Sequence, residues 1–73
     1  MIPIDLHGLT VPEAKRKVEA LINECRVEGY IKECEFITGT GKIKGAIQKL
    51  LTDYEIEYFD TWGNEGSFTA SVE

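Results

Sequence analysis

Two stretches of the chain repeat apolar residues at the spacing of an α-helix. The first, residues 11–28, follows Thr10 and Glu13, which have the spacing of a capping box. Its apolar positions are Val11, Ala14, Val18, Leu21, Ile22 and Cys25. The second stretch ends near Tyr54 and carries Ile43, Ala46, Ile47, Leu50 and Leu51. Both patterns predict amphipathic helices that bury one face, and Gly29 is the expected end of the first.

Four shorter segments have the apolar or alternating pattern of β-strands. The expected strands are residues 2–6, 34–38, 56–62 and 67–72. In the last of these, apolar residues alternate with serine and threonine, which predicts one buried face and one polar face. The Gly-Asn-Glu-Gly segment, residues 63–66, is typical of a hairpin turn between the last two strands.

The order of these elements, βαβαββ, predicts the fold class. Strands joined through a helix tend to pair in parallel by right-handed crossovers, whereas a tight turn joins antiparallel strands. We therefore expect an α/β sandwich with a four-stranded mixed sheet, two helices packed on one face, and a polar opposite face. The chain has 73 residues, which allows one domain.

The charge of the chain is unevenly distributed. The net charge is −5, but all eight basic residues precede Thr52, and residues 53–73 hold six acids and no base. The other seven acids leave residues 1–52 with a net charge of +1. This distribution allows a local basic surface. It excludes a strong, purely electrostatic association with a phosphate backbone.

Cysteine use and hydropathy bear on the cellular compartment. Cys25 lies on the apolar face of a predicted helix and Cys34 begins a predicted strand, and their spacing matches no CxxC motif. We expect two buried free thiols rather than a disulfide or a zinc site. No apolar stretch approaches the ~20 residues of a membrane helix, and no signal peptide pattern is found. These features favour a cytoplasmic protein with no membrane partner, which we expect to be a monomer.

Two loops carry the residues best suited to bind a ligand or to take part in a reaction. In α/β sheets, sites form beyond the carboxyl ends of the parallel strands. The segment Asp5-Leu6-His7-Gly8 follows the first strand, and Thr38-Gly39-Thr40-Gly41-Lys42 follows the second. Both loops should leave the sheet at the same edge, so we expect the two motifs to be neighbours.

The second loop has the composition of an anion-binding site. Its glycines let backbone N–H groups approach an anion closely, and the N-terminus of the following helix adds a favourable dipole. Lys42 and Lys44 would add positive charge, with Lys15 or Arg16 as further candidates. The spacing is not that of a Walker A loop, so nucleotide hydrolysis is disfavoured. An ordinary tight turn is the alternative interpretation.

His7 is the only histidine of the chain. Near neutral pH a histidine can donate or accept a proton, or donate a hydrogen bond to a phosphate. Asp5 lies two residues earlier on the predicted strand, so the two side chains would share one face and could pair or contact a substrate together. The alternative is that Asp5 caps the loop and His7 is an ordinary surface residue.

Two aromatic residues of the third strand also have two interpretations. Trp62 and Tyr58 could offer a stacking surface for a nucleobase. Aromatic residues on a strand are more often part of the core, which is the default interpretation.

Taken together, these motifs resemble the Smr (small MutS-related) domain family. The resemblance rests on IDLHGLT at residues 4–10, FITGTGK at 36–42 and GNEGSFTASV at 63–72, in the family's order and spacing. It covers essentially the whole chain, which we interpret as one Smr-like domain, residues 1–73, and it implies the same fold. Thr38 stands where many family members have histidine, so His7 remains the only imidazole.

The resemblance implies a nucleic-acid endonuclease that cleaves RNA or nicks DNA, or a non-catalytic module that binds nucleic acid or the ribosome. In an endonuclease, His7 would move a proton, and Asp5 would orient His7 or hold a metal-bound water. Mg²⁺ or Mn²⁺ is the cofactor to consider, and no residue is assigned as a metal ligand. The phosphate-binding candidates are Gly8, Thr38, Gly39, Thr40, Gly41, Lys42 and Lys44.

Overall fold

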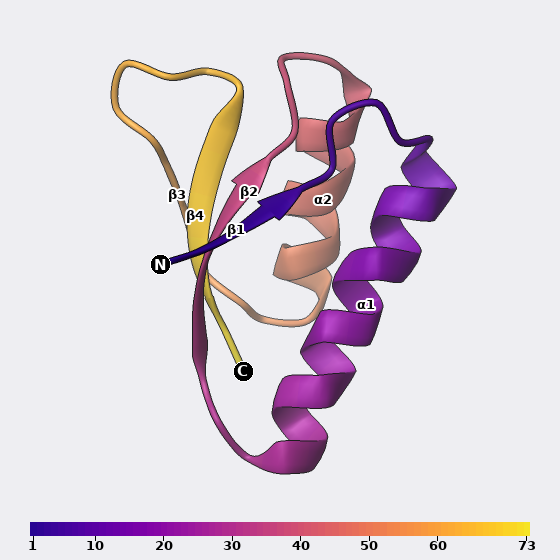
Figure 1. Ribbon diagram of the computed structural model, residues 1–73, viewed down its shortest axis with the longest axis vertical. Coiled ribbons are helices and arrows are strands. Elements are labelled where there is room, and N and C mark those ends of the chain that lie inside the picture. Colours follow the sequence, from indigo (N-terminus) through magenta and orange to yellow (C-terminus); the bar gives the residue numbers. More distant parts are fainter.

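The computed structural model describes all 73 residues as a sheet that is covered on one side by two helices (Figure 1). The strand order is β1-β2-β4-β3; β1 and β2 are parallel, and the other neighbouring strands are antiparallel. The predicted class, the mixed sheet and the placement of both helices on one face are confirmed. In chain order, the elements are β1 (Ile2–Asp5), α1 (Val11–Glu28), β2 (Lys32–Ile37), α2 (Lys42–Asp53), β3 (Tyr58–Asp60) and β4 (Ser67–Val72).

Local hydrogen bonds explain where α1 begins and ends. The Thr10 hydroxyl accepts a bond from the Glu13 N–H at 3.3 Å, and the Glu13 carboxylate accepts one from the Thr10 N–H at 2.9 Å. The bonds from the Thr10 backbone and hydroxyl hold the pKa of the Glu13 carboxyl below its ordinary value. Gly29 ends the helix in the left-handed conformation, with φ of 74°. Neither helix has the length and apolar character needed to cross a membrane.

The core lies between the helices and the inner face of the sheet. Phe36 and Phe68 are register partners on β2 and β4, and their ring centroids lie 5.3 Å apart. Tyr58 packs edge-on against Phe68 at 5.7 Å, so its default interpretation as a core residue is confirmed. Cys25 and Cys34 are buried free thiols, as expected, and burial raises the pKa of the Cys34 thiol.

The second strand starts and ends earlier than the apolar pattern predicted. β2 spans residues 32–37, whereas residues 34–38 were expected. Lys32 already pairs with Val72 in the antiparallel ladder between β2 and β4. Thr38 lies beyond the ladder and opens the following loop. The sequence did not predict the early start because its first residues, Lys32 and Glu33, are charged. They join the strand by pairing with β4, which is distant in the sequence.

The third strand is much shorter than the predicted range of residues 56–62. β3 covers only residues 58–60. Ile56 instead completes the end of α2, and Thr61 already belongs to the hairpin turn. Trp62 therefore leaves the sheet, and 98% of its surface is exposed. The default interpretation of Trp62 as a core residue was wrong.

α2 ends in a Schellman motif whose left-handed residue is a glutamate. Glu55 has φ of 61° and is the only residue other than glycine with a positive φ. Its N–H donates to the Thr52 carbonyl at 2.9 Å, and the Ile56 N–H donates to the Leu51 carbonyl at 2.8 Å. These two bonds satisfy the last carbonyls of the helix. A side chain in this conformation is strained, whereas glycine adopts it freely.

We expect Glu55→Gly to raise the free energy of unfolding by about 0.5–1 kcal/mol. Relief of left-handed strain, roughly 1–2 kcal/mol, exceeds the extra conformational entropy that glycine loses on folding, roughly 0.5–1 kcal/mol. Urea unfolding followed by circular dichroism measures the change. Glu55→Ala is the control, because it removes the same carboxylate and keeps the strain; it should stay within about 0.5 kcal/mol. An equal gain in both variants would mean that charge, not backbone strain, is responsible.

Candidate functional site

Three loops meet at one end of the sheet (Figure 1). The first loop, residues 6–10, follows β1, and the Gly-rich loop, residues 38–41, follows β2. The hairpin turn, residues 61–66, joins β3 to β4. In Figure 1 all three lie at the upper end of the molecule, where the parallel strands have their carboxyl ends. This is the end at which the sequence placed the site.

Main-chain hydrogen bonds connect the three loops. The Leu6 N–H donates to the Ile37 carbonyl at 2.8 Å, which extends the β1–β2 ladder into the first loop. The N–H groups of Thr38 and Gly39 both donate to the Gly66 carbonyl, each at 2.9 Å. The first two motifs are thus neighbours, as predicted, and the hairpin turn is bonded to the second of them.

The first loop is a tight turn that Asp5 caps. The Asp5 carboxylate accepts a hydrogen bond from the His7 N–H at 3.0 Å. The Leu9 N–H donates to the Leu6 carbonyl at 3.2 Å, and Gly8 has φ of 82°, which matches a type II turn with its required positive φ. β1 ends at Asp5, so the expected sharing of one strand face by Asp5 and His7 was wrong. The alternative, a cap by Asp5, describes the geometry.

His7 occupies the second position of this turn, and its side chain is exposed. Asp5 bonds the backbone of His7, and therefore fixes where the imidazole leaves the chain. The imidazole is available to a substrate at the end of the sheet. A histidine in such a place can hydrogen-bond a phosphate or transfer a proton.

The Gly-rich loop presents main-chain donors that have no partner within the protein. Gly41 begins α2 without a side-chain cap. The N–H groups of Thr40, Gly41 and Lys42 form no hydrogen bond. Free N–H groups at a helix N-terminus, together with the helix dipole, suit an anion.

The two lysines that follow the loop are placed differently. Lys42 is exposed and forms no salt bridge. Lys44 is 20% exposed, donates to the Glu65 carbonyl at 2.8 Å and pairs with the Asp60 carboxylate at 3.4 Å. Lys44 therefore ties α2 to the hairpin turn, and Asp60 offsets its charge. Lys42 is the lysine of this loop that is left open to an anion.

Thr38 has its side chain turned into the protein. It is 4% exposed, and its hydroxyl donates to the carbonyls of Gly39 at 2.9 Å and Gly66 at 3.4 Å. The hydroxyl proton is thus used to hold the Gly-rich loop against the hairpin turn. The predicted phosphate-binding residues that remain exposed are Gly8, Thr40, Gly41 and Lys42.

The hairpin turn adds a polar groove that the sequence did not predict. The groove is lined by Thr40, Thr61, Gly63, Asn64, Glu65 and Gly66, and none of these is hydrophobic. A Cβ on Gly66 would lie 3.6 Å from the Gly39 Cα, an ordinary van der Waals contact, so the hairpin turn and the Gly-rich loop are direct neighbours. The Gly-Asn-Glu-Gly pattern signalled a turn, but the contact with the Gly-rich loop depends on distant pairing.

One serine of β4 also departs from the alternating pattern. Ser67 was expected on the polar face, yet it is buried. Its hydroxyl donates to the Thr61 hydroxyl at 3.3 Å. Thr61, at the base of the hairpin turn, therefore covers Ser67 at the start of β4.

Comparison with known proteins agrees with this arrangement. The family model of the Smr domain matches residues 4–70. This chain belongs to the Smr domain family. The crystal structure of the Smr domain of Thermus thermophilus MutS2 is similar, with a TM-score of 0.80 and 25% sequence identity. The similarity covers 100% of this chain and 99% of the other. No curated protein sequence matches the chain.

Smr domains are nuclease-related or nucleic-acid-binding domains, and the three loops of this Smr domain all lie within the matched residues. The side chains of this Smr domain form no cluster of the usual metal ligands. No three histidine, cysteine, aspartate or glutamate side chains come together as a ligand set.

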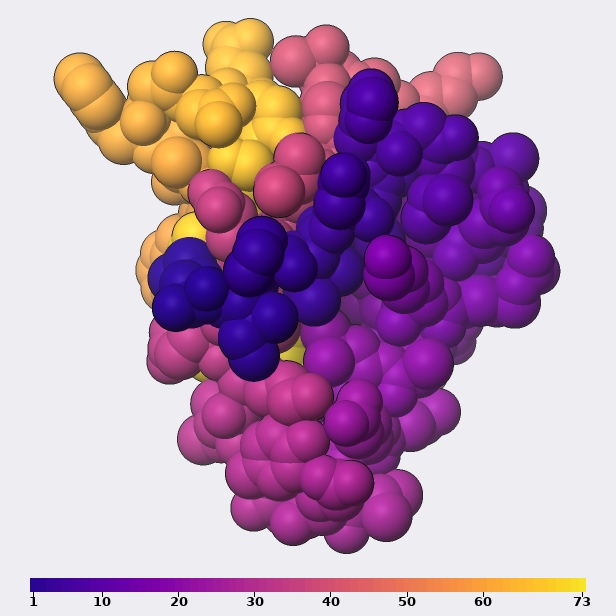
Figure 2. Space-filling model, in the orientation of Figure 1, coloured from indigo at the N-terminus to yellow at the C-terminus, as the bar shows by residue number.

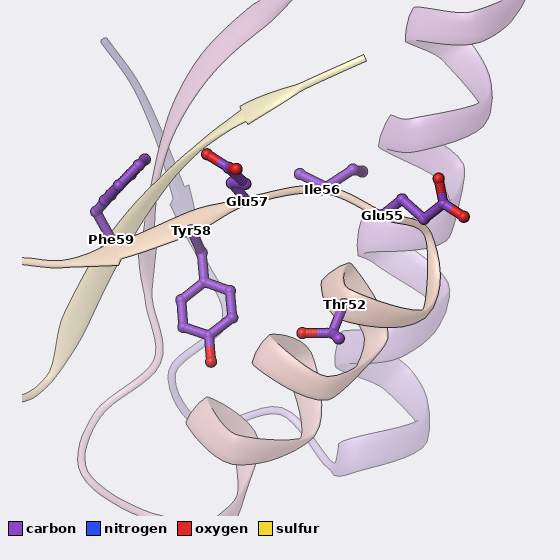
Figure 3. A pocket seen from close by; sticks show the side chains of 6 residues that line it. All are labelled: Thr52, Glu55, Ile56, Glu57, Tyr58 and Phe59. Atoms are coloured by element: carbon purple, nitrogen blue, oxygen red, sulfur yellow. The ribbon is translucent and has the colours of Figure 1, made fainter.

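A second pocket of the Smr domain lies at the other end of α2 (Figure 3). Glu57 and Phe59 project from one side of the chain, and Tyr58 points to the other side, toward the core. Two glutamates line the pocket and would repel a phosphate, and no candidate site residue reaches it. Its lining residues are Thr52, Glu55, Ile56, Glu57, Tyr58 and Phe59. The candidate site therefore remains at the end where the three loops meet.

Proposed function

We propose that this Smr domain is an endonuclease that cleaves RNA or nicks DNA where its three loops meet. One observation carries the proposal. The exposed imidazole of His7 stands on the first loop, whose main chain is bonded to the end of β2. The unpaired N–H groups at the start of α2 follow shortly after that end of β2. Such a site can bind a phosphodiester and present a proton-transfer group beside it.

The proposed mechanism uses the chain's own groups. The N–H groups of Thr40, Gly41 and Lys42 would bind the scissile phosphate and the charge that develops on it. His7 would act as general base. On RNA it would take the proton of the 2′-hydroxyl, whose oxygen attacks phosphorus and displaces the 5′-oxygen. On DNA it would take a proton from the attacking water, whose oxygen bonds to phosphorus as one ester P–O bond breaks; the leaving oxygen then takes a proton from solvent, as the 5′-oxygen does on RNA. Asp5 is a positioning residue, because it holds the backbone of His7.

A non-catalytic module that binds nucleic acid or the ribosome through the same loops is the second candidate. The contact between Asp5 and His7 favours it, because the carboxylate meets the backbone N–H rather than the imidazole. A base that lacks an orienting partner is less strongly activated. In this function the phosphate site is kept and His7 serves as a hydrogen-bond donor.

Cleavage and binding assays distinguish the two candidates. Pure protein is incubated with labelled single-stranded RNA, single-stranded DNA and supercoiled plasmid, in Mg²⁺, in Mn²⁺ and in EDTA. The endonuclease should cleave at least one of the three substrates. Binding without cleavage would favour the non-catalytic module.

Lys42→Ala tests the phosphate site itself. Single-strand binding should weaken, and the slope of log K against log salt should fall by about 0.7, the value for one phosphate contact. Lys49→Ala is the matched control, because it removes the same charge from an exposed lysine that pairs with Asp53 farther along α2. Equal losses in the two variants would mean that only the net charge matters, and would count against this surface.

A further inference from the structure

We propose that Trp62 stacks on an unpaired nucleobase, so that the hairpin turn is a base-binding subsite beside the phosphate site. The inference rests on the proposed binding of nucleic acid. It adds a residue that would favour single-stranded over double-stranded nucleic acid. Trp62 is 98% exposed, more than any other large hydrophobic residue of the chain. The core makes no use of the indole, and its two faces are open to a ligand.

The turn that carries Trp62 is held in place from several sides. Within the turn, the Asn64 N–H donates to the Thr61 carbonyl at 3.1 Å, and the Asn64 side chain accepts a bond from the Gly66 N–H at 2.9 Å. Lys44 of α2 holds the turn at the Glu65 carbonyl. The backbone beneath Trp62 is therefore already ordered, and stacking of a base has to order only the indole side chain.

The polar groove connects Trp62 to the phosphate site. Gly63, the residue after Trp62, lines one part of the groove, and Thr40 of the Gly-rich loop lines another. A base on the indole would thus place its sugar and phosphate along a groove that leads to the free N–H groups of Thr40 and Gly41. In the space-filling view, the orange-to-yellow hairpin region projects from the body of the molecule, which leaves it accessible (Figure 2).

The charges around the groove favour stacking over electrostatic attraction. Asp60 pairs with Lys44 at 3.4 Å and accepts a hydrogen bond from Gln48 at 3.0 Å, so Lys44 offsets part of its charge. Glu65 is the one acid that lines the groove. A groove without cations of its own binds a nucleic acid through base contacts, and base–aromatic stacking is tolerant of sequence. In a duplex the faces of the bases are already covered, so the partner is a single strand.

The fluorescence of Trp62 provides the test, because it is the only tryptophan. Titration with a single-stranded oligonucleotide at low salt should quench the fluorescence to a saturating level. An abasic oligonucleotide of the same length and a duplex should quench much less. Equal quenching by the duplex or by the abasic strand would overturn the inference.

Variants measure the contribution of the indole. Trp62→Ala should weaken single-strand binding by about 5- to 160-fold, which corresponds to the roughly 1–3 kcal/mol of one stacked base. Trp62→Phe should recover most of the affinity. Phe59→Ala is the control, since Phe59 is also exposed but does not line the groove; it should bind as the wild type does. An equal loss for Phe59→Ala would overturn the inference.

The outcomes separate this inference from the proposed function. If the wild type binds a single strand without quenching, and Trp62→Ala binds equally well, the stacking subsite is wrong and the phosphate site stands. If the wild type binds no nucleic acid at all, the proposed function fails and the subsite fails with it.

Discussion

His7→Ala should lower the rate of phosphodiester cleavage by roughly 10²- to 10⁴-fold, the usual contribution of a proton-transfer group. The domain should remain folded, because truncation of an exposed side chain usually changes stability by less than about 0.5 kcal/mol. Initial cleavage rates over a range of pH measure the loss, and urea unfolding checks the fold. The pH dependence that a general base imposes should disappear in the variant.

Two variants of Asp5 are the matched controls. Asp5→Asn keeps an oxygen that can accept the bond from the His7 N–H, so its cleavage rate should stay close to that of the wild type. Asp5→Ala removes this cap and should lower the rate, though less than His7→Ala does. A His7→Ala protein that folds normally and cleaves at the wild-type rate would instead make His7 a binding or structural residue.

Phe68→Ala should destabilise the domain by about 3–5 kcal/mol, the usual cost of removing a buried phenylalanine side chain. Phe68 is fully buried and contacts two aromatic rings, those of Phe36 and Tyr58, so its truncation leaves a cavity in the core and removes both contacts. At roughly 0.05–0.15 kcal/mol per residue, a chain of this length has little stability to spare. We expect the midpoint of urea unfolding to fall sharply.

Phe59→Ala makes the same chemical change on the neighbouring strand. Its side chain is 63% exposed, and it should change the free energy of unfolding by only about 0.5 kcal/mol. A similar loss of stability in both variants would contradict the assignment of the inner and outer faces of the sheet.

Elements whose signals are local could be predicted from the sequence. The bounds of α1 follow from a capping box and a glycine that lie at its own ends. The bounds of β2 and β3 could not be predicted in this way, because pairing with β4 decides them. Lys32 joins β2 because Val72 stands opposite, which no apolar pattern around Lys32 could indicate.

The candidate site likewise has some features that local sequence predicts and others that depend on distant residues. The parallel pairing of β1 and β2 follows from their connection through a helix, so the meeting of the first loop with the Gly-rich loop was predictable. The engagement of Lys44 with the hairpin turn was not, because its partners Asp60 and Glu65 lie far along the chain. Trp62 was assigned to a strand because its neighbours are aromatic, yet the strand ends before it.

The bonds that join the three loops are made almost entirely by main-chain atoms. Leu6 bonds to Ile37, and Thr38 and Gly39 bond to Gly66, through N–H and carbonyl groups that every residue except proline provides. The frame of the site is therefore insensitive to most changes of side chain, which is consistent with a similar fold at 25% identity. Evolution or an engineer can exchange the exposed groups on this frame, for example to alter which nucleic acid is bound, without rebuilding the scaffold beneath them.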